Sequence, residues 1–319
     1  MDPTYSPEQI AFIALLDDLL GKRGGVQRAR SVEAGGSGCD LSLFSELLAI
    51  GAGDLPTEQD RAILFEEAGR YLVRGPLFTT LGYALPLLEA AAPDCELLDA
   101  TRAGRAIPVV GFGARTVSDA DAATHIVFVE GGEVTVATRE QCLLEDLSSF
   151  DPGRRLARIR EVGGRSPLGF VRADADHRAR WAVAAACELI GVAQACLEMA
   201  VTYAKSREQF GRPIGSFQAV SHQCVDMYLI IEAARGHAYY AAWAVQDREP
   251  CAALAAAQAV ACAGEAALDC AQRNIQIHGA IGFTWEHDAH LFLRRARSAI
   301  TLSTMVQDPA DRIADLLGL

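Results

Sequence analysis

The sequence lacks several features that would assign it to large classes of protein. Its nine cysteines, spread over 319 residues, never form a CxxC pair, and most of them lie in alanine-rich helical patterns. A free thiol in such a pattern behaves as a small apolar residue, so we expect neither a disulfide framework nor a zinc site. No run of about 18 uncharged apolar residues is present, which argues against a membrane span.

Positive charge is also scarce. The chain carries 29 Lys and Arg against 41 Asp and Glu, a formal net charge of −12. Nucleic-acid-binding proteins need basic patches, so we expect no nucleic-acid partner. Phosphate-bearing ligands stay possible, since they require only a local cation. The opening MDPTYSPEQIAF has neither a basic segment nor a hydrophobic one, so we expect no secretory signal and a reducing cytoplasm as the location.

Short motifs of several enzyme classes are missing. No GxGxxG follows a strand pattern, and neither a P-loop nor a GxSxG segment occurs. His287 and His290 are spaced i, i+3 on one helical pattern, but no second ligand pair accompanies them. We therefore expect no metal site.

Three kinds of pattern follow one another along the chain. Residues 1–103 show helical spacing of apolar residues, with capping signals at Ser6 and Thr57. Residues 104–173 contain the β-branched segments IPVVGF, HIVFVE and EVTVAT, which predict about five or six strands. Residues 174–319 contain four long helical patterns: His177–Glu208, Phe217–Glu249, Ala252–His278 and Glu286–Thr304.

This order predicts an α+β protein with three domains. Long helices joined by short breaks are typical of an antiparallel bundle. We expect an N-terminal helical domain over 1–103, a small middle β-domain over 104–173, and a C-terminal four-helix bundle over 174–319. The patterns alone assign no chemistry to these domains.

The first bundle helix ends in KSREQFGRPIG, residues 205–215. The simplest interpretation is structural, because basic residues stabilise the C-terminal end of a helix and glycines suit the turn that follows. The alternative is functional. A guanidinium group beside a glycine turn could bind a pyrophosphate.

A second motif, QIHGAIGFTWEHDAHLFLRR, covers residues 276–295. Gly279 can take a positive φ and so end a helix, and Thr284 is the expected N-cap of the next one. Spacing alone favours a corner between two helices in which the glycines allow close packing.

The order of residues in these motifs is more specific than their spacing. KSREQFGRPIGSFQAVSH (205–222) and QIHGAIGFTWEHDAHLFLRRA (276–296) resemble two signature regions of the FAD-dependent acyl-CoA dehydrogenases. DPGRRLARIRE (151–161) and FEEAGRYLVRGP (65–76) resemble weaker parts of the same family, so the resemblance covers the whole chain. It implies the family fold, which has the order of domains already predicted.

The resemblance also implies a chemistry. In this family an acyl-CoA loses an α-proton to a carboxylate and a β-hydride to the flavin, and becomes a 2-enoyl-CoA. Each flavin lies between two subunits, with its ring on one β-domain and its pyrophosphate and adenosine on the neighbour's bundle. Arg207 matches the pyrophosphate-binding arginine. The other implied FAD contacts are Gln209, Phe210, Gln276, Gly279 and Ala280, the last standing where the family has a second glycine.

The remaining half of the family site has no counterpart. Nothing in residues 107–172 matches the GSD and WITN segments that hold the flavin ring. The two family positions for the catalytic glutamate fall on Ser303 and Trp181. Neither side chain can accept the proton, because a general base needs a carboxylate or an imidazole.

The leading hypothesis is a subunit of a heteromeric acyl-CoA dehydrogenase that lacks its own base and completes a partner's FAD site. Short chains of this kind resemble the α₂β₂ enzymes of actinobacterial steroid side-chain degradation, so the implied substrate is a steroid or branched acyl-CoA. The implied partners are a second subunit with the catalytic Glu and, as electron acceptor, electron-transfer flavoprotein. Two alternatives remain: a homomeric dehydrogenase with an atypical base such as Glu188 or Asp176, or a flavin-free structural or regulatory paralogue.

Overall fold

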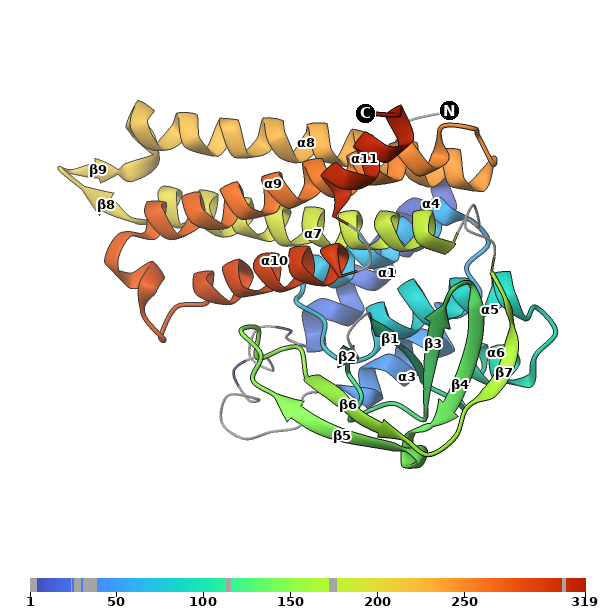
Figure 1. Ribbon diagram of the computed structural model, residues 1–319. Helices are drawn as coiled ribbons and strands as arrows, with labels where there is room; N and C mark the ends of the chain where they lie inside the picture. The colour runs from blue at the N-terminus through green and yellow to red at the C-terminus, as the bar shows by residue number, and fades with distance from the viewer. Residues whose placement is uncertain are drawn as a thin grey trace.

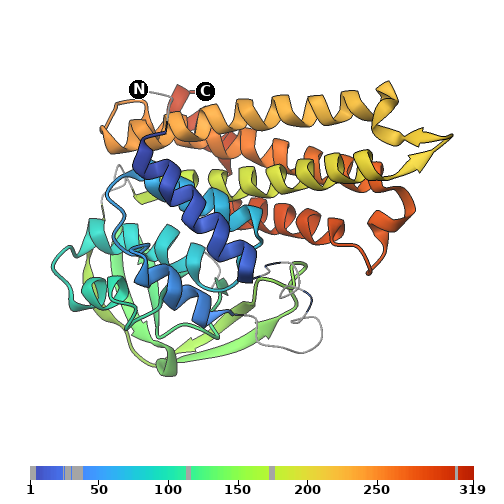
Figure 2. The ribbon, with the colours of Figure 1, turned by 180° about the vertical axis from the view of Figure 1, so that it is seen from behind.

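The computed structural model describes residues 5–23, 25, 30, 39–112, 116–171, 177–305 and 308–319. A twisted sheet lies along one side of a bundle of long helices, and shorter helices pack against both (Figures 1 and 2). The chain forms helices, then strands, then long helices. This order confirms the predicted α+β class.

The N-terminal helices begin at the predicted caps. Ser6 Oγ accepts a hydrogen bond from the Gln9 N–H at 3.2 Å, and Gln9 Oε1 accepts one from the Ser6 N–H at 3.1 Å. Thr57 Oγ1 accepts from the Asp60 N–H at 3.0 Å. These bonds satisfy amides that have no partner in a first helical turn. The helices are α1 (Pro7–Arg23), α3 (Leu41–Ala49), α4 (Glu58–Arg70), the π-helix η1 (Leu77–Ala84), α5 (Leu85–Ala91) and α6 (Glu96–Arg102).

The sheet has more strands than predicted. The segments IPVVGF, HIVFVE and EVTVAT do form strands, but seven strands pair among the described residues, in the order β5-β6-β2-β1-β3-β4-β7. One missed strand, β2, has three residues, too few to show an alternating pattern. The strands are β1 (Pro108–Phe112), β2 (Thr116–Ser118), β3 (His125–Glu130), β4 (Glu133–Thr138), β5 (Cys142–Leu147), β6 (Leu156–Val162) and β7 (Ser166–Phe170).

The bundle contains the four predicted long helices and a short fifth one. The last long helix begins at Ala289 rather than at Glu286, and Thr284 does not cap it. Instead Thr284 Oγ1 donates to the Ile281 carbonyl at 2.9 Å. The helices are α7 (His177–Ser206), α8 (Gln218–Gln246), α9 (Ala252–His278), α10 (Ala289–Thr304) and α11 (Pro309–Leu317), which was not predicted.

Two glycines let α4 and α7 cross at backbone contact. A Cβ atom on Gly69 would lie 2.1 Å from the carbonyl oxygen of Glu188, and one on Gly191 would lie 1.9 Å from that of Glu66. Real Cβ atoms do not approach other atoms so closely, so any side chain at either glycine would push the helices apart. This crossing places Glu188 deep between the N-terminal helices and the bundle.

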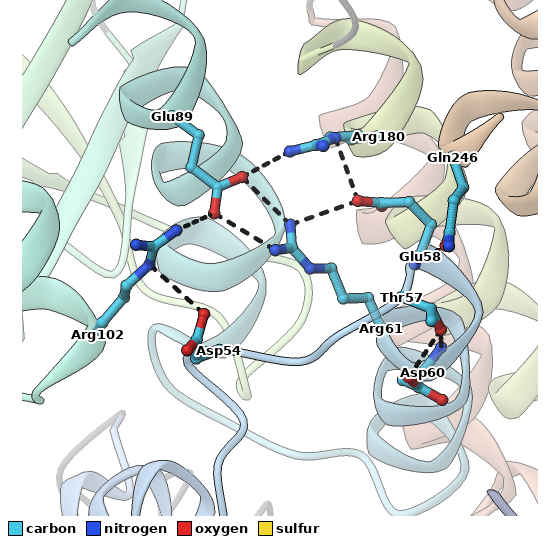
Figure 3. Close-up of polar contacts among 9 residues, drawn as sticks. All are labelled: Asp54, Thr57, Glu58, Asp60, Arg61, Glu89, Arg102, Arg180 and Gln246. Carbon is cyan, nitrogen blue, oxygen red and sulfur yellow. Dashed lines mark hydrogen bonds and ion pairs between the residues drawn. The ribbon is translucent and has the colours of Figure 1, made fainter. Parts of the chain in front are cut away.

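A cluster of ion pairs joins the N-terminal helices to the start of α7 (Figure 3). The Glu89 carboxylate on α5 accepts from Arg102 at 2.9 Å and from Arg180 at 2.5 Å, and Arg61 lies 3.3 Å away. Burial by itself would raise the pKa of Glu89, but the three guanidinium groups lower it. The cluster therefore links α4, α5, α6 and α7.

By length and composition alone, α7 and the helical run Ala252–Phe283 could each cross a membrane. However, 78% and 56% of their most apolar windows are buried inside the protein. Core helices of a bundle have this character, so their apolar surface is explained by packing within the chain.

Candidate functional site

The segment after α7 forms a small hairpin that projects from one end of the bundle (Figure 1). Strands β8 (Glu208–Gln209) and β9 (Arg212–Pro213) pair across a turn in which Phe210 has φ +54° and Gly211 φ +78°. A phenylalanine in this left-handed region is uncommon and costs conformational energy. Its ring is 93% exposed, which leaves a large apolar surface at the tip of the hairpin.

The polar residues of the hairpin are also exposed. Within the described part of the chain, the Arg207 side chain forms no hydrogen bond or ion pair, while its backbone N–H donates to the Tyr203 carbonyl at 2.8 Å. The Gln209 amide donates only to the neighbouring Glu208 carbonyl at 2.8 Å. A guanidinium group with five available donors can bind an anionic oxygen cluster from another molecule.

The second motif forms the corner between α9 and α10. Gly279 ends α9 with φ +65° and ψ −141°, as its sequence position predicts, and η4 (Gly279–Phe283) follows. A Cβ on Gly279 would meet no atom within 4 Å, so this position requires glycine for its backbone angles and not for space. Gln276, Gly279 and Ala280 are all exposed.

The fold brings the hairpin and the corner to the same end of the bundle (Figure 1). The ring of Tyr203, one turn before Arg207, stacks on the ring of His278 with centroids 4.3 Å apart. His278 directly precedes Gly279. The residues that the resemblance assigns to the flavin thus share one exposed end, although their flavin contacts stay a prediction.

The two positions that the resemblance predicts for the base lie elsewhere, on helices that line a small interior cavity. Trp181 is buried, and its ring meets that of Tyr83 edge-on at 3.8 Å. Ser303 donates from its Oγ to the Ile300 carbonyl at 2.7 Å. The cavity is lined by Leu302, next to Ser303, and by Ala185, one turn from Trp181. Its volume is only about 10 Å³, room for roughly one water molecule.

Buried charges fill the space around this cavity. Arg154, from the β5–β6 connection, donates to both oxygens of Glu188 on α7. Arg295 on α10 reaches Glu188 at 3.3 Å and donates from Nε to Asp151 at 2.6 Å. Arg295 Nη1 also donates to the Val73 carbonyl at 3.0 Å. We call Asp151, Arg154, Glu188 and Arg295 the interior ion cluster; each is at most 7% exposed.

The contacts of this cluster argue against Glu188 as a catalytic base. Both of its oxygens are bound by Arg154, and its side chain is 2% exposed. A carboxylate whose oxygens are occupied by guanidinium groups and which is buried has no access to a substrate. Asp176, the other acid considered, lies outside the described residues.

Asp119 is a buried acid that the sequence did not single out. Its Oδ2 accepts from Thr79 at 3.0 Å and from Ser118 at 3.2 Å, while Oδ1 has no hydrogen-bond partner among the described residues. Burial raises the pKa of Asp119 to about 7, although Arg154 and the two hydroxyls oppose the rise. Such a pKa suits proton transfer, but the adjoining cavity of about 10 Å³ admits no acyl chain.

A larger groove lies between α10 and the β5–β6 connection. One hollow of about 800 Å³ is lined by Phe150, Trp285 and Arg294, and an adjoining one of about 380 Å³ by Phe150, Arg297 and several apolar residues. The Arg294 guanidinium lies 5.4 Å from the Phe150 ring centroid and 4.8 Å from that of Trp285. None of the described lining residues is acidic, so the groove could accept a flat anionic ligand.

No metal centre is evident in the described part of the chain. No three His, Cys, Asp or Glu side chains come together there in a way that could hold an ion. The nine cysteines are free thiols.

Comparison with known proteins gives concordant results. Residues 177–302 match the family model described as acyl-CoA dehydrogenase, C-terminal domain. The chain is 38% identical over 295 residues to acyl-CoA dehydrogenase IpdE2 of Mycobacterium tuberculosis, covering 89% of each chain. A relative with the same name from Mycolicibacterium smegmatis is 33% identical over 76% of this chain and 74% of its own length.

Solved structures share the fold over the full length. The ChsE4-ChsE5 complex from Mycobacterium tuberculosis matches with a TM-score of 0.88 at 20% identity, covering 100% of this chain and 99% of that one. The Tcur3481-Tcur3483 steroid acyl-CoA dehydrogenase, as a G363A variant, matches at 0.85 with 23% identity and 98% of both chains. A PigA structure in complex with FAD matches at 0.82 with 18% identity over 100% of both.

The relative that is 38% identical over most of both chains shows the family directly, and the matching folds agree with it. The chain belongs to the acyl-CoA dehydrogenase family of flavin-dependent oxidoreductases.

Proposed function

We propose that this chain is a subunit of a heteromeric acyl-CoA dehydrogenase that completes a partner's FAD site and has no catalytic base of its own. One observation carries the proposal. The interior beside Trp181 and Ser303 is closed by buried ion pairs, whereas the hairpin and the corner that match the flavin motifs are exposed.

The exposed end fits the outer half of a flavin. Arg207 would bind the pyrophosphate through charge-assisted hydrogen bonds, with Gln209 and Phe210 beside it on the hairpin. Gln276, Gly279 and Ala280 would contact the adenosine side, and within this motif the methyl of Ala280 departs from the family's second glycine. The free guanidinium and the exposed ring of Phe210 support this assignment.

The interior does not fit a flavin ring or an acyl chain. A cavity of about 10 Å³ is far smaller than the hundreds of cubic ångströms typical of small-molecule sites. When bound, the flavin supplies the oxidation of the acyl group, so we assign that step to the partner's active site. The catalytic Glu would come from this second subunit.

The proposed substrate and electron acceptor rest on similarity to known proteins. One matching structure is described as a steroid acyl-CoA dehydrogenase and another as a complex of two differently named chains. We therefore propose a steroid side-chain CoA as the substrate and the cytoplasm as the location. Electron-transfer flavoprotein is the proposed electron acceptor, on the family resemblance.

The test is to purify the chain alone and with the product of a neighbouring dehydrogenase gene. We expect the chain alone to be colourless and inactive. The complex should be yellow, carry fewer flavins than chains, and oxidise an acyl-CoA. A homomer with full FAD occupancy and turnover would contradict the proposal, and a colourless complex would favour the flavin-free paralogue.

The groove between α10 and the β5–β6 connection favours a second candidate, a homomeric enzyme that holds its own flavin there. Its lining of Phe150, Trp285, Arg294 and Arg297 suits a flat anionic ligand. Arg297→Ala separates the two candidates, because it should lower flavin content only if the groove holds the flavin.

A further inference from the structure

A hydrogen bond that requires a neutral histidine holds the start of α10. The N–H of Ala289, the first residue of α10, donates to Nδ1 of His287 at 3.1 Å. Because an amide nitrogen can only donate, Nδ1 must be the unprotonated ring nitrogen and Nε2 must carry the proton. Asp288, which directly precedes the helix, forms no side-chain cap bond. His287 therefore supplies the acceptor that an N-cap residue normally provides.

The same histidine belongs to a row of rings that joins three helices. Its ring centroid lies 4.2 Å from that of His278, whose ring stacks in turn on Tyr203. His278 Nδ1 donates to the Asn274 carbonyl at 2.8 Å, which fixes this ring at the end of α9. The row therefore ties the start of α10 to the ends of α9 and α7, where the two proposed flavin-binding segments begin.

The charged groups around His287 come from several elements. His278 on α9, His290 on α10 and Arg30 from the N-terminal part disfavour a positive charge on the ring, while Asp288 favours one. Asp288 is itself paired with Arg30, whose Nε donates to it at 2.7 Å, so its attraction for a protonated ring is shared. Burial first, and then His278, lower the pKa of His287 below its ordinary value.

We propose that His287, in its neutral form, is the positioning residue that holds the corner carrying Gln276 and Gly279, and that its protonation releases this corner. A proton on Nδ1 would remove the acceptor for the Ala289 N–H. It would also place a positive charge at the positive end of the α10 dipole and against His278. This inference rests on the proposed function, since it adds that flavin retention by the complex falls at acid pH.

The direction of the pH effect follows from linkage. The pKa of His287 is lower in the folded corner than in an unfolded chain, so the unfolded form binds the proton first. The stabilisation is complete above the ordinary histidine value of about 6.5 and is lost as the pH falls below it. The loss levels off below the folded pKa. Burial also lowers the pKa of His278, which adds an effect of the same sign.

The first experiment uses the full chain by itself. Imidazole ¹⁵N NMR at pH 7.5 should show His287 as the Nε2-protonated tautomer. The protection factor of the Ala289 amide should fall between pH 7.5 and 5.5, because protonation of His287 removes the acceptor of this amide. His287→Asn keeps an acceptor for the N–H two residues on, as in an Asx turn, and should leave only the part of the pH dependence that comes from His278. His287→Ala should give low protection at both pH values.

The second experiment measures flavin per complex at the same two pH values. Wild type and His287→Ala should lose flavin at pH 5.5, and His287→Ala should also hold less at pH 7.5. His287→Asn should lose less flavin than wild type at pH 5.5, and His237→Asn, on the exposed side of α8 and outside both flavin motifs, should behave as wild type. Equal flavin content in His287→Ala and wild type, or a His287 ring protonated on Nδ1 at pH 7.5, would overturn the inference.

The two experiments separate this inference from the proposed function. A wild-type complex without flavin at pH 7.5 contradicts the proposed function, and amide exchange in the isolated chain then decides the role of His287. Unchanged exchange in His287→Ala contradicts the role of His287 and leaves the flavin assignment of Arg207 standing.

Discussion

The interior of this protein and the end of its bundle use arginine in opposite ways. In the interior, Arg154 and Arg295 are almost fully buried and paired with Glu188 and Asp151. At the end of the bundle, Arg207 is exposed and has no side-chain partner in the described part of the chain. In the interior the guanidinium groups fill and close a space, whereas Arg207 is left available to another molecule.

This contrast bears on the proposal that the chain has no catalytic base of its own. The exposed motifs resemble those of the acyl-CoA dehydrogenases, whereas the positions that the resemblance predicts for the base hold a buried tryptophan and a serine bonded to its own helix. Buried ion pairs are costly to assemble and seldom add stability over apolar packing. The interior ion cluster therefore closes this space and is a weak source of net stability.

The largest expected effect comes from breaking the interior ion cluster. Glu188→Ala removes the carboxylate that binds both Arg154 and Arg295 in the interior, and should lower the free energy of unfolding by about 3–5 kcal/mol. Urea unfolding of the chain would measure it. The matched control is Glu232→Ala, which removes an exposed α8 glutamate paired with Arg235 and should cost less than about 1 kcal/mol. Equal losses for the two variants would contradict a special role for the interior.

The next largest effect is expected at the other region. Arg207→Ala should weaken flavin retention in the complex by roughly 1.5–3 kcal/mol, because it removes a charge-assisted hydrogen bond. The unfolding free energy of the chain alone should change by less than about 0.5 kcal/mol, since the side chain has no described partner. Absorbance of the purified complex gives the flavin content, and no change there would contradict the assignment.

A third change tests the backbone of the corner. Gly279→Ala forces a Cβ onto φ +65° and ψ −141° and should cost about 1–3 kcal/mol of stability. Gly236→Ala is the control, because Gly236 lies within α8 with open space around it and an ordinary helical φ. That variant should gain about 0.5–1 kcal/mol. Thermal unfolding of both variants would show whether the signs differ as expected.

The smallest effect is expected from a substitution that adds a carboxylate, because it should add no enzymatic activity. Ser303→Glu restores an acid at a family base position, yet the purified homomer should show no acyl-CoA oxidation with an artificial electron acceptor. The reason is that the cavity beside it stays at about 10 Å³ while Arg154, Glu188 and Arg295 fill the surroundings. Measurable turnover would show that the interior opens to substrate, and would contradict the contrast between a closed interior and an exposed bundle end.

Local chemistry made much of the fold predictable. The caps at Ser6 and Thr57 and the turn at Gly279 depend on neighbours within a few residues, and all three were confirmed. The predicted start of α10 was wrong, because the ring of His287, and not the hydroxyl of Thr284, accepts a hydrogen bond from the N–H of Ala289, the first helical residue. No sequence rule for caps favours histidine at that place. The boundaries proposed at 103/104 and 173/174 stay predictions.

The sequence by itself determined the family, the order of helices and strands, and the motifs around Arg207 and Gln276. Each of these depends on residues that are contiguous in the chain. Only the tertiary structure showed that the interior is closed. Glu188 meets Arg154 and Arg295 from 34 and 107 residues away, and such pairs become visible only when the chain has folded. Burial makes the pairing of these charges energetically important, because the same residues on a surface would be ordinary solvated side chains.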